Sequence, residues 1–158
     1  MSDGKILDPN RASSRSAELR ERGAVIVFTN GVFDLLHPGH IRYLQQAREL
    51  GSCLFVGINT DASVRRIKGE NRPVVPLEAR MEVLAALESV DFVTWFDEDT
   101  PAEIIRLVRP QVLVKGGDWK IEEIVGREYV ESYGGTVRTI PFLPGYSTSA
   151  ILEKIAKL

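Results

Sequence analysis

The sequence predicts an α/β fold, a doubly wound sheet of five parallel strands with helices on both faces. Two observations predict it. Short apolar runs rich in β-branched residues alternate along the chain with longer stretches whose apolar residues recur at helical spacing. The short runs are nearly free of polar residues, as expected for strands that are buried on both faces of a parallel sheet.

The elements can be placed in order along the chain. The expected strands are 24–28, 54–58, 92–95, 112–114 and 136–140. The expected helices are 41–50, 61–67, 77–87, 101–108, 124–133 and 147–156. Thr100 and Glu103 read as a capping box that opens the fourth of these helices. In such a Rossmann-like sheet, ligands bind beyond the carboxyl ends of the strands, so we look for chemistry after strands one, four and five.

The domain organisation is simple. Residues 1–22 are polar and are predicted to form a leader, either mobile or holding a short helix from Arg15 to Arg22. Residues 23–158 are predicted to form one domain, because a chain of 158 residues with 44% hydrophobic residues is long enough to bury a single core.

Composition excludes several classes of protein. With 20 basic and 22 acidic residues and a net charge of −2, the chain is a poor candidate for binding nucleic acid. Cys53 is the only cysteine, which excludes an intrachain disulfide and a cysteine-based zinc site. No apolar run approaches the roughly 18 residues of a membrane span, and the first ten residues do not resemble a signal peptide. We therefore expect a cytoplasmic protein without nucleic-acid or membrane partners.

The segment from Thr29 to His40 carries the strongest chemical signal. It joins a buried strand to an amphipathic helix and holds both histidines of the chain, His37 and His40. It has neither a P-loop lysine motif nor a G-x-G-x-x-G motif. Free N–H groups at the start of the helix favour an anion, Gly31 and Gly39 let the backbone approach a ligand, and two imidazoles can donate to phosphate oxygens. The alternatives are metal ligation and ordinary helix-capping histidines.

Three motifs carry a family resemblance. His37-Pro-Gly-His40, with Gly31-Val-Phe-Asp34 upstream, resembles the H-x-G-H element of the nucleotidyltransferase (cytidylyltransferase-like) superfamily. Val114–Trp119 and Gly145–Ser149 resemble the later motifs of that family. The similarity runs over almost all of 24–156 and is greatest to the adenylyltransferase domain that acts on heptose 1-phosphate. That domain is often fused to a sugar kinase. A chain of 158 residues has no room for such a kinase, so it looks like a stand-alone version served by a separate upstream kinase.

The resemblance implies an enzyme of ADP-heptose biosynthesis, a step toward the lipopolysaccharide core. AMP would pass from ATP to heptose 1-phosphate and pyrophosphate would leave, with Mg²⁺ carried by the nucleotide phosphates and a homodimer as the assembly. The alternative is a cytidylyltransferase acting on a polyol phosphate such as glycerol 3-phosphate. Relatives of that kind tend to carry an arginine after the last strand's proline, where Phe142 follows Pro141 here. A noncatalytic nucleotide-binding regulator and a plain scaffold that binds a partner are the remaining readings.

The family motifs also imply roles for individual residues. The expected catalytic residues are His37, His40 and Lys68, and no metal ligand is expected. The expected nucleotide-binding residues are Asn30, Gly31, Val32, Phe33, His37, Gly39, His40, Gly116, Asp118, Ser147, Thr148 and Ser149. The expected substrate-binding residues are Asp34, Lys68, Arg80, Lys115 and Trp119.

Structural roles stay open for several of these residues. Asp34 could orient its loop, and Phe33 or Trp119 could belong to the core. The serines and threonine of 147–149 could cap a helix, Lys68 could be a solvated helix end, and Arg80 could pair with Glu78 or Glu82.

Overall fold

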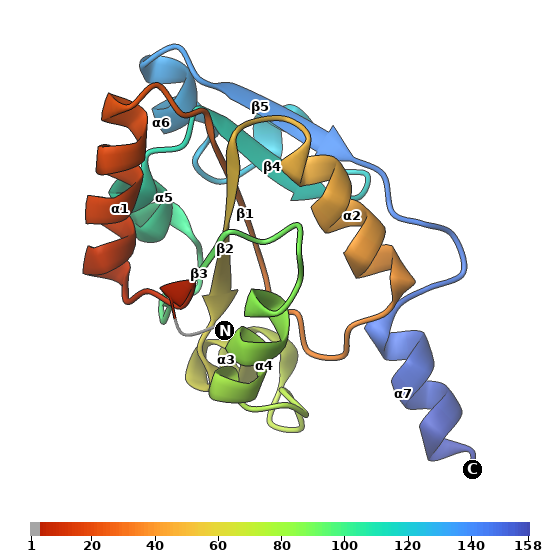
Figure 1. Cartoon of the computed structure of the whole chain (residues 1–158). Coiled ribbons are helices and arrows are strands. Elements are labelled where there is room, and N and C mark those ends of the chain that lie inside the picture. The colour runs from red at the N-terminus through yellow and green to blue at the C-terminus, as the bar shows by residue number, and fades with distance from the viewer. Residues whose placement is uncertain (1–3) are drawn as a thin grey trace.

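Five parallel strands form one sheet in the order β3-β2-β1-β4-β5, which confirms the predicted fold class. The structure is a computed structural model and describes residues 4–158 (Figure 1). The strands are β1 (Ile26–Gly31), β2 (Cys53–Asn59), β3 (Phe92–Phe96), β4 (Val112–Gly116) and β5 (Thr136–Ile140). The chain builds outward from β1 to β3 and then returns to the other side of β1 as β4. The carboxyl ends of β1 and β4 therefore define the switch point of the sheet.

Helices cover both faces of this sheet. They are α1 (Pro9–Glu21), α2 (Pro38–Arg48), α3 (Asp61–Lys68), α4 (Leu77–Ala85), α5 (Ala102–Val108), α6 (Arg127–Ser132) and α7 (Thr148–Ala156). Side chains of α2 and α4 share one apolar cluster with the sheet, and side chains of α1, α5 and α6 share the other. In Figure 1 the second group lies together on the left and α2 lies on the right.

Alternation along the strands explains why both faces are covered. In β1, Val27 faces the α2–α4 cluster, whereas Ile26 and Phe28 face the opposite cluster. All three are fully buried. Because successive strand residues point to opposite faces, an unbroken apolar run supplies two cores at once. Each such side chain contributes about 1.5–3 kcal/mol by leaving water.

The amino-terminal segment is packed more extensively than the sequence indicates. The helix expected from Arg15 spans Pro9–Glu21 instead, with Asp8 accepting from the Arg11 N–H as its N-cap. Its buried residues are Ala12 and Ser16. Ala12 belongs to the apolar cluster that α5 and α6 form with the sheet, and the Ser16 hydroxyl donates to the Val108 carbonyl at the end of α5. The high polarity of the segment conceals this narrow buried face.

Two other elements differ from expectation. Helix α5 begins at Ala102 with Pro101 as its N-cap and without a side-chain cap, so the predicted capping box of Thr100 and Glu103 does not form. Thr100 lies before the N-cap, where its hydroxyl is out of register with the first free amides. Helix α6 is shorter than 124–133, because Gly126 takes a left-handed conformation with φ of 91° just before it.

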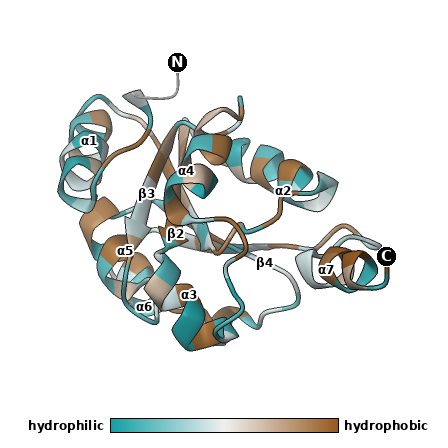
Figure 2. Ribbon diagram, turned by 90° about the horizontal axis from the view of Figure 1, so that it is seen from below, coloured by the Kyte–Doolittle hydropathy of each residue, from teal (hydrophilic) through white to brown (hydrophobic). Residues whose placement is uncertain are grey.

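Helix α7 stands apart from the rest of the fold, as Figures 1 and 2 both show. None of its residues is buried, although its mean hydropathy is apolar and Ile155 is 54% exposed. Across the described residues, no helix combines the length and the apolar character needed to cross a membrane.

Candidate active site

A cavity of about 450 Å³ opens at the carboxyl ends of β1 and β4, where the sheet order reverses. Segments that are far apart in the sequence line it: the β1–α2 loop, the end of α3, the end of β4 and the start of α7. The predicted site residues that line it are Asn30, Gly31, Val32, Phe33, Asp34, His37, Gly39, His40, Lys68, Lys115, Gly116, Trp119, Ser147, Thr148 and Ser149. The predicted motifs thus converge on one space.

His37 and His40 both hydrogen-bond to the main chain at the start of α2. His37 is the N-cap residue, and its Nδ1 accepts the Gly39 N–H at 3.1 Å. Nδ1 of His40 accepts the His37 N–H at 3.3 Å. A neutral imidazole that accepts at Nδ1 must carry its proton on Nε2. Helix capping and phosphate binding are therefore compatible, because each ring keeps an Nε2–H donor for a ligand.

Burial keeps both rings neutral. It lowers the pKa of His37 below its ordinary value. Burial, assisted by the nearby His37 ring, lowers the pKa of His40 to about 4. The ring centroids are 3.9 Å apart, so two positive charges would repel each other strongly here. At neutral pH the site presents two neutral donors at the positive end of a helix.

Gly31 and Gly39 make room for the protein's own rings. A Cβ on Gly39 would lie 2.8 Å from Cε1 of His37, and one on Gly31 would lie 2.9 Å from Cε2 of Phe33. Both glycines also line the cavity, so the expectation that they let the backbone approach a ligand stays a prediction. Because neither glycine has a Cβ, the Phe33 ring can pack against Gly31 and the His37 ring against Gly39. Phe33 itself has a left-handed backbone conformation, with φ of 48°.

The start of α7 forms the adjoining wall. Ser147 is its N-cap and accepts the Ala150 N–H at 3.0 Å. Thr148 donates to the Leu35 carbonyl at 3.0 Å, which ties α7 to the histidine loop. The Ser149 hydroxyl has no hydrogen-bond partner within residues 4–158. The two helix starts thus meet at one cavity, and both offer unpaired N–H groups to an anion.

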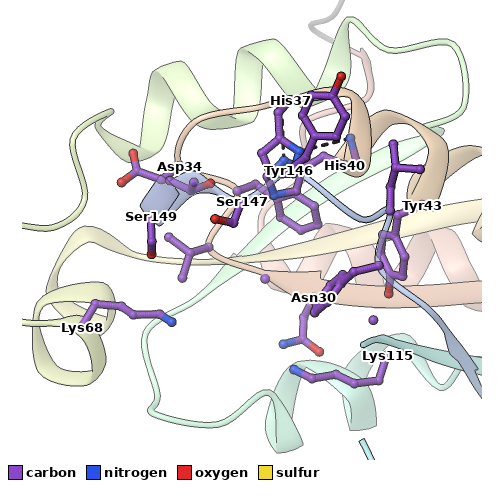
Figure 3. A pocket seen from close by; sticks show the side chains of 18 of the residues that line it. Asn30, Asp34, His37, His40, Tyr43, Lys68, Lys115, Tyr146, Ser147 and Ser149 are labelled. Atoms are coloured by element: carbon purple, nitrogen blue, oxygen red, sulfur yellow. Dashed lines mark hydrogen bonds between the residues drawn. The ribbon is translucent and has the colours of Figure 1, made fainter. Parts of the chain in front are cut away.

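Lysines approach the cavity from another side. Figure 3 shows Lys68 and Lys115 extending toward the same space below the histidines. Burial and the charge of Lys68 lower the pKa of Lys115. Its Nζ lies 5.2 Å from the centroid of the Trp119 ring, and within the described chain it has no carboxylate partner. A half-buried, unpaired ammonium group is costly without an anion, which favours a ligand of negative charge.

Asp34 orients a loop. Its carboxylate is 1% exposed and accepts the N–H groups of Val74 and Val75 and the Nε–H of Arg72. Burial alone would raise the pKa of Asp34, but these hydrogen bonds and the Arg72 charge lower it overall. Because its oxygens already accept these hydrogen bonds, Asp34 is better explained as a residue that orients its loop than as one that contacts substrate directly.

Arg80 and Asp118 do not reach the cavity. The Arg80 side chain is fully buried and donates to the carbonyls of Val75, Val32 and Asn59 and to the carboxylate of Asp61. The expected substrate role of Arg80 is therefore corrected, because its donors are committed inside the protein. Its ion-pair partner is Asp61, not Glu78 or Glu82. Asp118 is exposed and lies outside the cavity lining.

Other lining residues were not expected from the sequence. They are Tyr43, Arg72, Phe142, Leu143 and Tyr146. Tyr146 immediately precedes the Ser147–Ser149 motif, and Tyr43 follows His40 by three helical positions, so their proximity to recognised motifs was a usable signal. Burial raises the pKa of Tyr43 to about 12, and its hydroxyl lies 2.6 Å from that of Thr29.

Together, the doubly wound parallel sheet and the cavity between two helix starts at its switch point define a Rossmann-like α/β protein. The cytidylyltransferase-like family model matches residues 28–154, and the chain belongs to that family.

Curated relatives and solved structures agree with this assignment. The "Bifunctional protein HldE" of Hahella chejuensis is 56% identical over 140 residues, which cover 89% of this chain and 29% of that protein. The protein of the same name from Citrifermentans bemidjiense is 54% identical over 154 residues, covering 98% and 32%. This chain thus spans about a third of the length of these relatives.

Among solved structures, a lipopolysaccharide core biosynthesis protein from Thermoplasma volcanium superposes with a TM-score of 0.63 at 30% identity, covering 77% of this chain and 98% of that one. Pantoate-beta-alanine ligase from Francisella tularensis superposes with a TM-score of 0.62 at 14% identity, covering 98% and 78%, and supports the fold alone.

Proposed function

We propose that this chain is an adenylyltransferase that transfers AMP from ATP to a heptose 1-phosphate, giving ADP-heptose and pyrophosphate. The observation that carries the proposal is the pair of Nε2–H donors of His37 and His40 beside the start of α7, with Lys68 and Lys115 across the cavity. The relatives that share more than half of their aligned residues with this chain support the same reaction class.

The chemistry is an in-line displacement. An oxygen of the acceptor phosphate attacks the α-phosphorus of ATP, a new P–O bond forms, and the bond to the β-phosphate oxygen breaks. The acceptor oxygen is already anionic, so no general base is needed. The protein contributes positioning and electrostatic stabilisation, which suits fixed neutral donors on a helix start and the lysine cations opposite them.

His37 and His40 are assigned to the triphosphate, together with the amides of α2 and the hydroxyls of Ser147–Ser149. Lys68 is assigned to stabilising the negative charge that develops as the two phosphates come together. These groups act without proton transfer: the histidines donate from Nε2 while Nδ1 remains occupied by the main chain.

Mg²⁺ is proposed as an ion carried by the nucleotide. Among residues 4–158, Asp34 is the one carboxylate that lines the cavity, and its oxygens already accept N–H donors. Within residues 4–158, no group of three or more His, Cys, Asp or Glu side chains is arranged to hold a metal. The donor set therefore fits an ion whose ligands are phosphate oxygens and water, neutralising charge on the triphosphate.

The proposal also covers the source of the sugar phosphate, the cellular compartment and the oligomeric state. A sugar kinase must supply the 1-phosphate, and the use of ATP suits the cytoplasm. A homodimer is supported by the apolar side chains that α7 leaves uncovered, including Ile155. Light scattering during size-exclusion chromatography tests the dimer, and a monomer at all concentrations would contradict it.

Pyrophosphate release tests the reaction. ATP and CTP are each combined with heptose 1-phosphate and with glycerol 3-phosphate in the presence of Mg²⁺. Turnover confined to ATP with heptose 1-phosphate supports the proposal. Preferential turnover of CTP with glycerol 3-phosphate would replace it by the cytidylyltransferase alternative. No turnover with any pair, but retained nucleotide binding, would favour a regulator.

A further inference from the structure

Arg72 is a cation at the cavity that the reaction described above leaves unused. It lies on the loop between α3 and α4, and its side chain is 18% exposed. Its Nε donates to Asp34 Oδ2 at 2.9 Å. Neither Nη group has a partner within residues 4–158, and Arg72 belongs to the cavity lining. One edge of the guanidinium is thus anchored while its other donors remain available.

Asp34 does not require Arg72 as a hydrogen-bond donor. The Val74 N–H lies 2.9 Å from Oδ2 and the Val75 N–H lies 2.8 Å from Oδ1, so the main chain already supplies both carboxylate oxygens. The added Nε contact is therefore better explained by what it does for Arg72. It fixes the rotamer of a long side chain and so reduces the entropy that a ligand contact would otherwise cost.

Charge in the cavity points to an anionic ligand for this guanidinium. A turn closed by the Arg72 N–H and the Gly69 carbonyl, 3.1 Å apart, brings Arg72 to the same cavity as Lys68. Lys115 also lines that cavity, and the nearby charge of Lys68 contributes to the lowering of the Lys115 pKa. Asp34 supplies the one carboxylate among these lining residues. The excess positive charge is what a phosphate would neutralise.

The cavity offers two kinds of donor, and its proposed reaction brings together a triphosphate and the phosphate of the acceptor. The wall built by the starts of α2 and α7 holds amides, hydroxyls and neutral imidazoles, which suit a triphosphate. The positively charged donors of the same cavity are Lys68, Lys115 and the anchored Arg72. A planar guanidinium binds phosphate through two parallel N–H donors and so fixes its orientation, which a lysine cannot do.

We propose that Arg72 binds the phosphate of the acceptor and that Asp34 is its positioning residue. The proposal rests on the proposed function and extends it. Arg72 orients the attacking oxygen toward the α-phosphorus, and Asp34 holds the guanidinium at the correct angle from behind.

Steady-state kinetics of Arg72→Gln, Arg72→Lys and Asp34→Asn test this, with Arg65→Gln as the matched control. Arg65 is an exposed residue of α3 outside the cavity, so its replacement removes the same charge from the same region. Arg72→Gln should raise KM for the sugar phosphate about 10- to 100-fold, the loss expected for hydrogen bonds to a charged group, while KM for ATP changes little. Arg72→Lys and Asp34→Asn should give intermediate rises, and Arg65→Gln none.

Two kinetic outcomes would overturn the proposal. One is a lower thermal midpoint of Arg72→Gln with an unchanged KM for the sugar phosphate, which indicates a purely structural ion pair. The other is a rise confined to KM for ATP, which assigns Arg72 to the triphosphate.

A binding experiment separates this proposal from the proposed function. Trp119 lines the cavity, so its fluorescence can follow inorganic phosphate added to protein saturated with Mg²⁺ and a nonhydrolysable ATP analogue. Weaker phosphate binding by Arg72→Gln than by wild type and Arg65→Gln supports the role of Arg72, even if heptose 1-phosphate is not turned over and the proposed function fails. Equal phosphate binding by all three proteins overturns it, even if the enzyme makes ADP-heptose.

Discussion

The ring of Tyr146 stacks on the ring of His37, with centroids 5.9 Å apart and planes inclined by 20°. This contact joins the loop before α7 to the first residue of the histidine turn. The Thr148–Leu35 hydrogen bond makes a second connection between the same two segments. The two parts of the proposed triphosphate-binding site, the β1–α2 loop and the start of α7, are therefore held together by side-chain contacts and not by the sheet alone.

The two roles of His37 can be separated by substitution. His37→Asn keeps a side-chain acceptor for the helix start but removes the Nε2–H donor, whereas His37→Ala removes both. Both variants should lose about 100- to 1,000-fold in kcat, as for a preorganised donor to a transition state. Only His37→Ala should also lose about 1 kcal/mol of unfolding free energy. Pyrophosphate release and urea denaturation measure the two effects. A fully active His37→Asn would refute the donor role.

Stability should depend on pH through His40. Its pKa is about 4 in the folded protein against 6.5 for the free side chain. Between these two pH values the unfolded chain binds more protons than the folded protein. The contribution of His40 to the unfolding free energy is therefore complete above pH 6.5 and is lost as the pH decreases from 6.5 toward 4. His40→Asn should flatten this slope. Urea midpoints across that range for both proteins check it, and parallel curves would contradict the assignment.

Gly39 should matter more for turnover than for folding. In Gly39→Ala the new Cβ would lie 2.8 Å from the His37 ring, which must then move. We expect kcat to fall at least about 10-fold, as when a catalytic donor is misplaced. Stability should change by less than about 1 kcal/mol, since alanine favours the helix. Gly4→Ala is the control, because nothing lies within 4 Å of its added Cβ. Unchanged kcat in Gly39→Ala would show that the ring position is not critical.

Arg80 should matter for stability. Arg80→Met removes the buried donor to the carbonyls of Val75, Val32 and Asn59 and the cation paired with Asp61, which keeps the Leu77 N–H, so the unfolding free energy should fall by about 3 kcal/mol. Arg106→Gln breaks an exposed ion pair with Glu103 and should change it by less than about 1 kcal/mol. Denaturation curves compare them. If Arg80→Met kept wild-type stability and instead lost affinity for the sugar phosphate, the rejected substrate role would be restored.

Much of the fold could be predicted because the strands are read from local apolar runs, and the five expected strands are present. The histidine turn could also be predicted, since strand, loop and helix start are contiguous in the sequence. The anchoring of Arg72 by Asp34 could not be predicted, because it joins residues that are 38 positions apart in the sequence. Arg80 was mistaken for a ligand residue, yet it lies in the helical stripe of Leu77, Met81 and Leu84, and that position indicated burial.

Helix α7 has a consequence for how natural variation can act on this protein. Since none of its side chains is buried, the helix adds little to the cores that maintain the sheet, yet its first turn borders the cavity. Substitutions along it can therefore retune ligand capture while leaving the folding equilibrium almost unaltered. Beyond its first turn, which Thr148 ties to the histidine loop, this helix lets evolution change affinity with little effect on the hydrophobic cores.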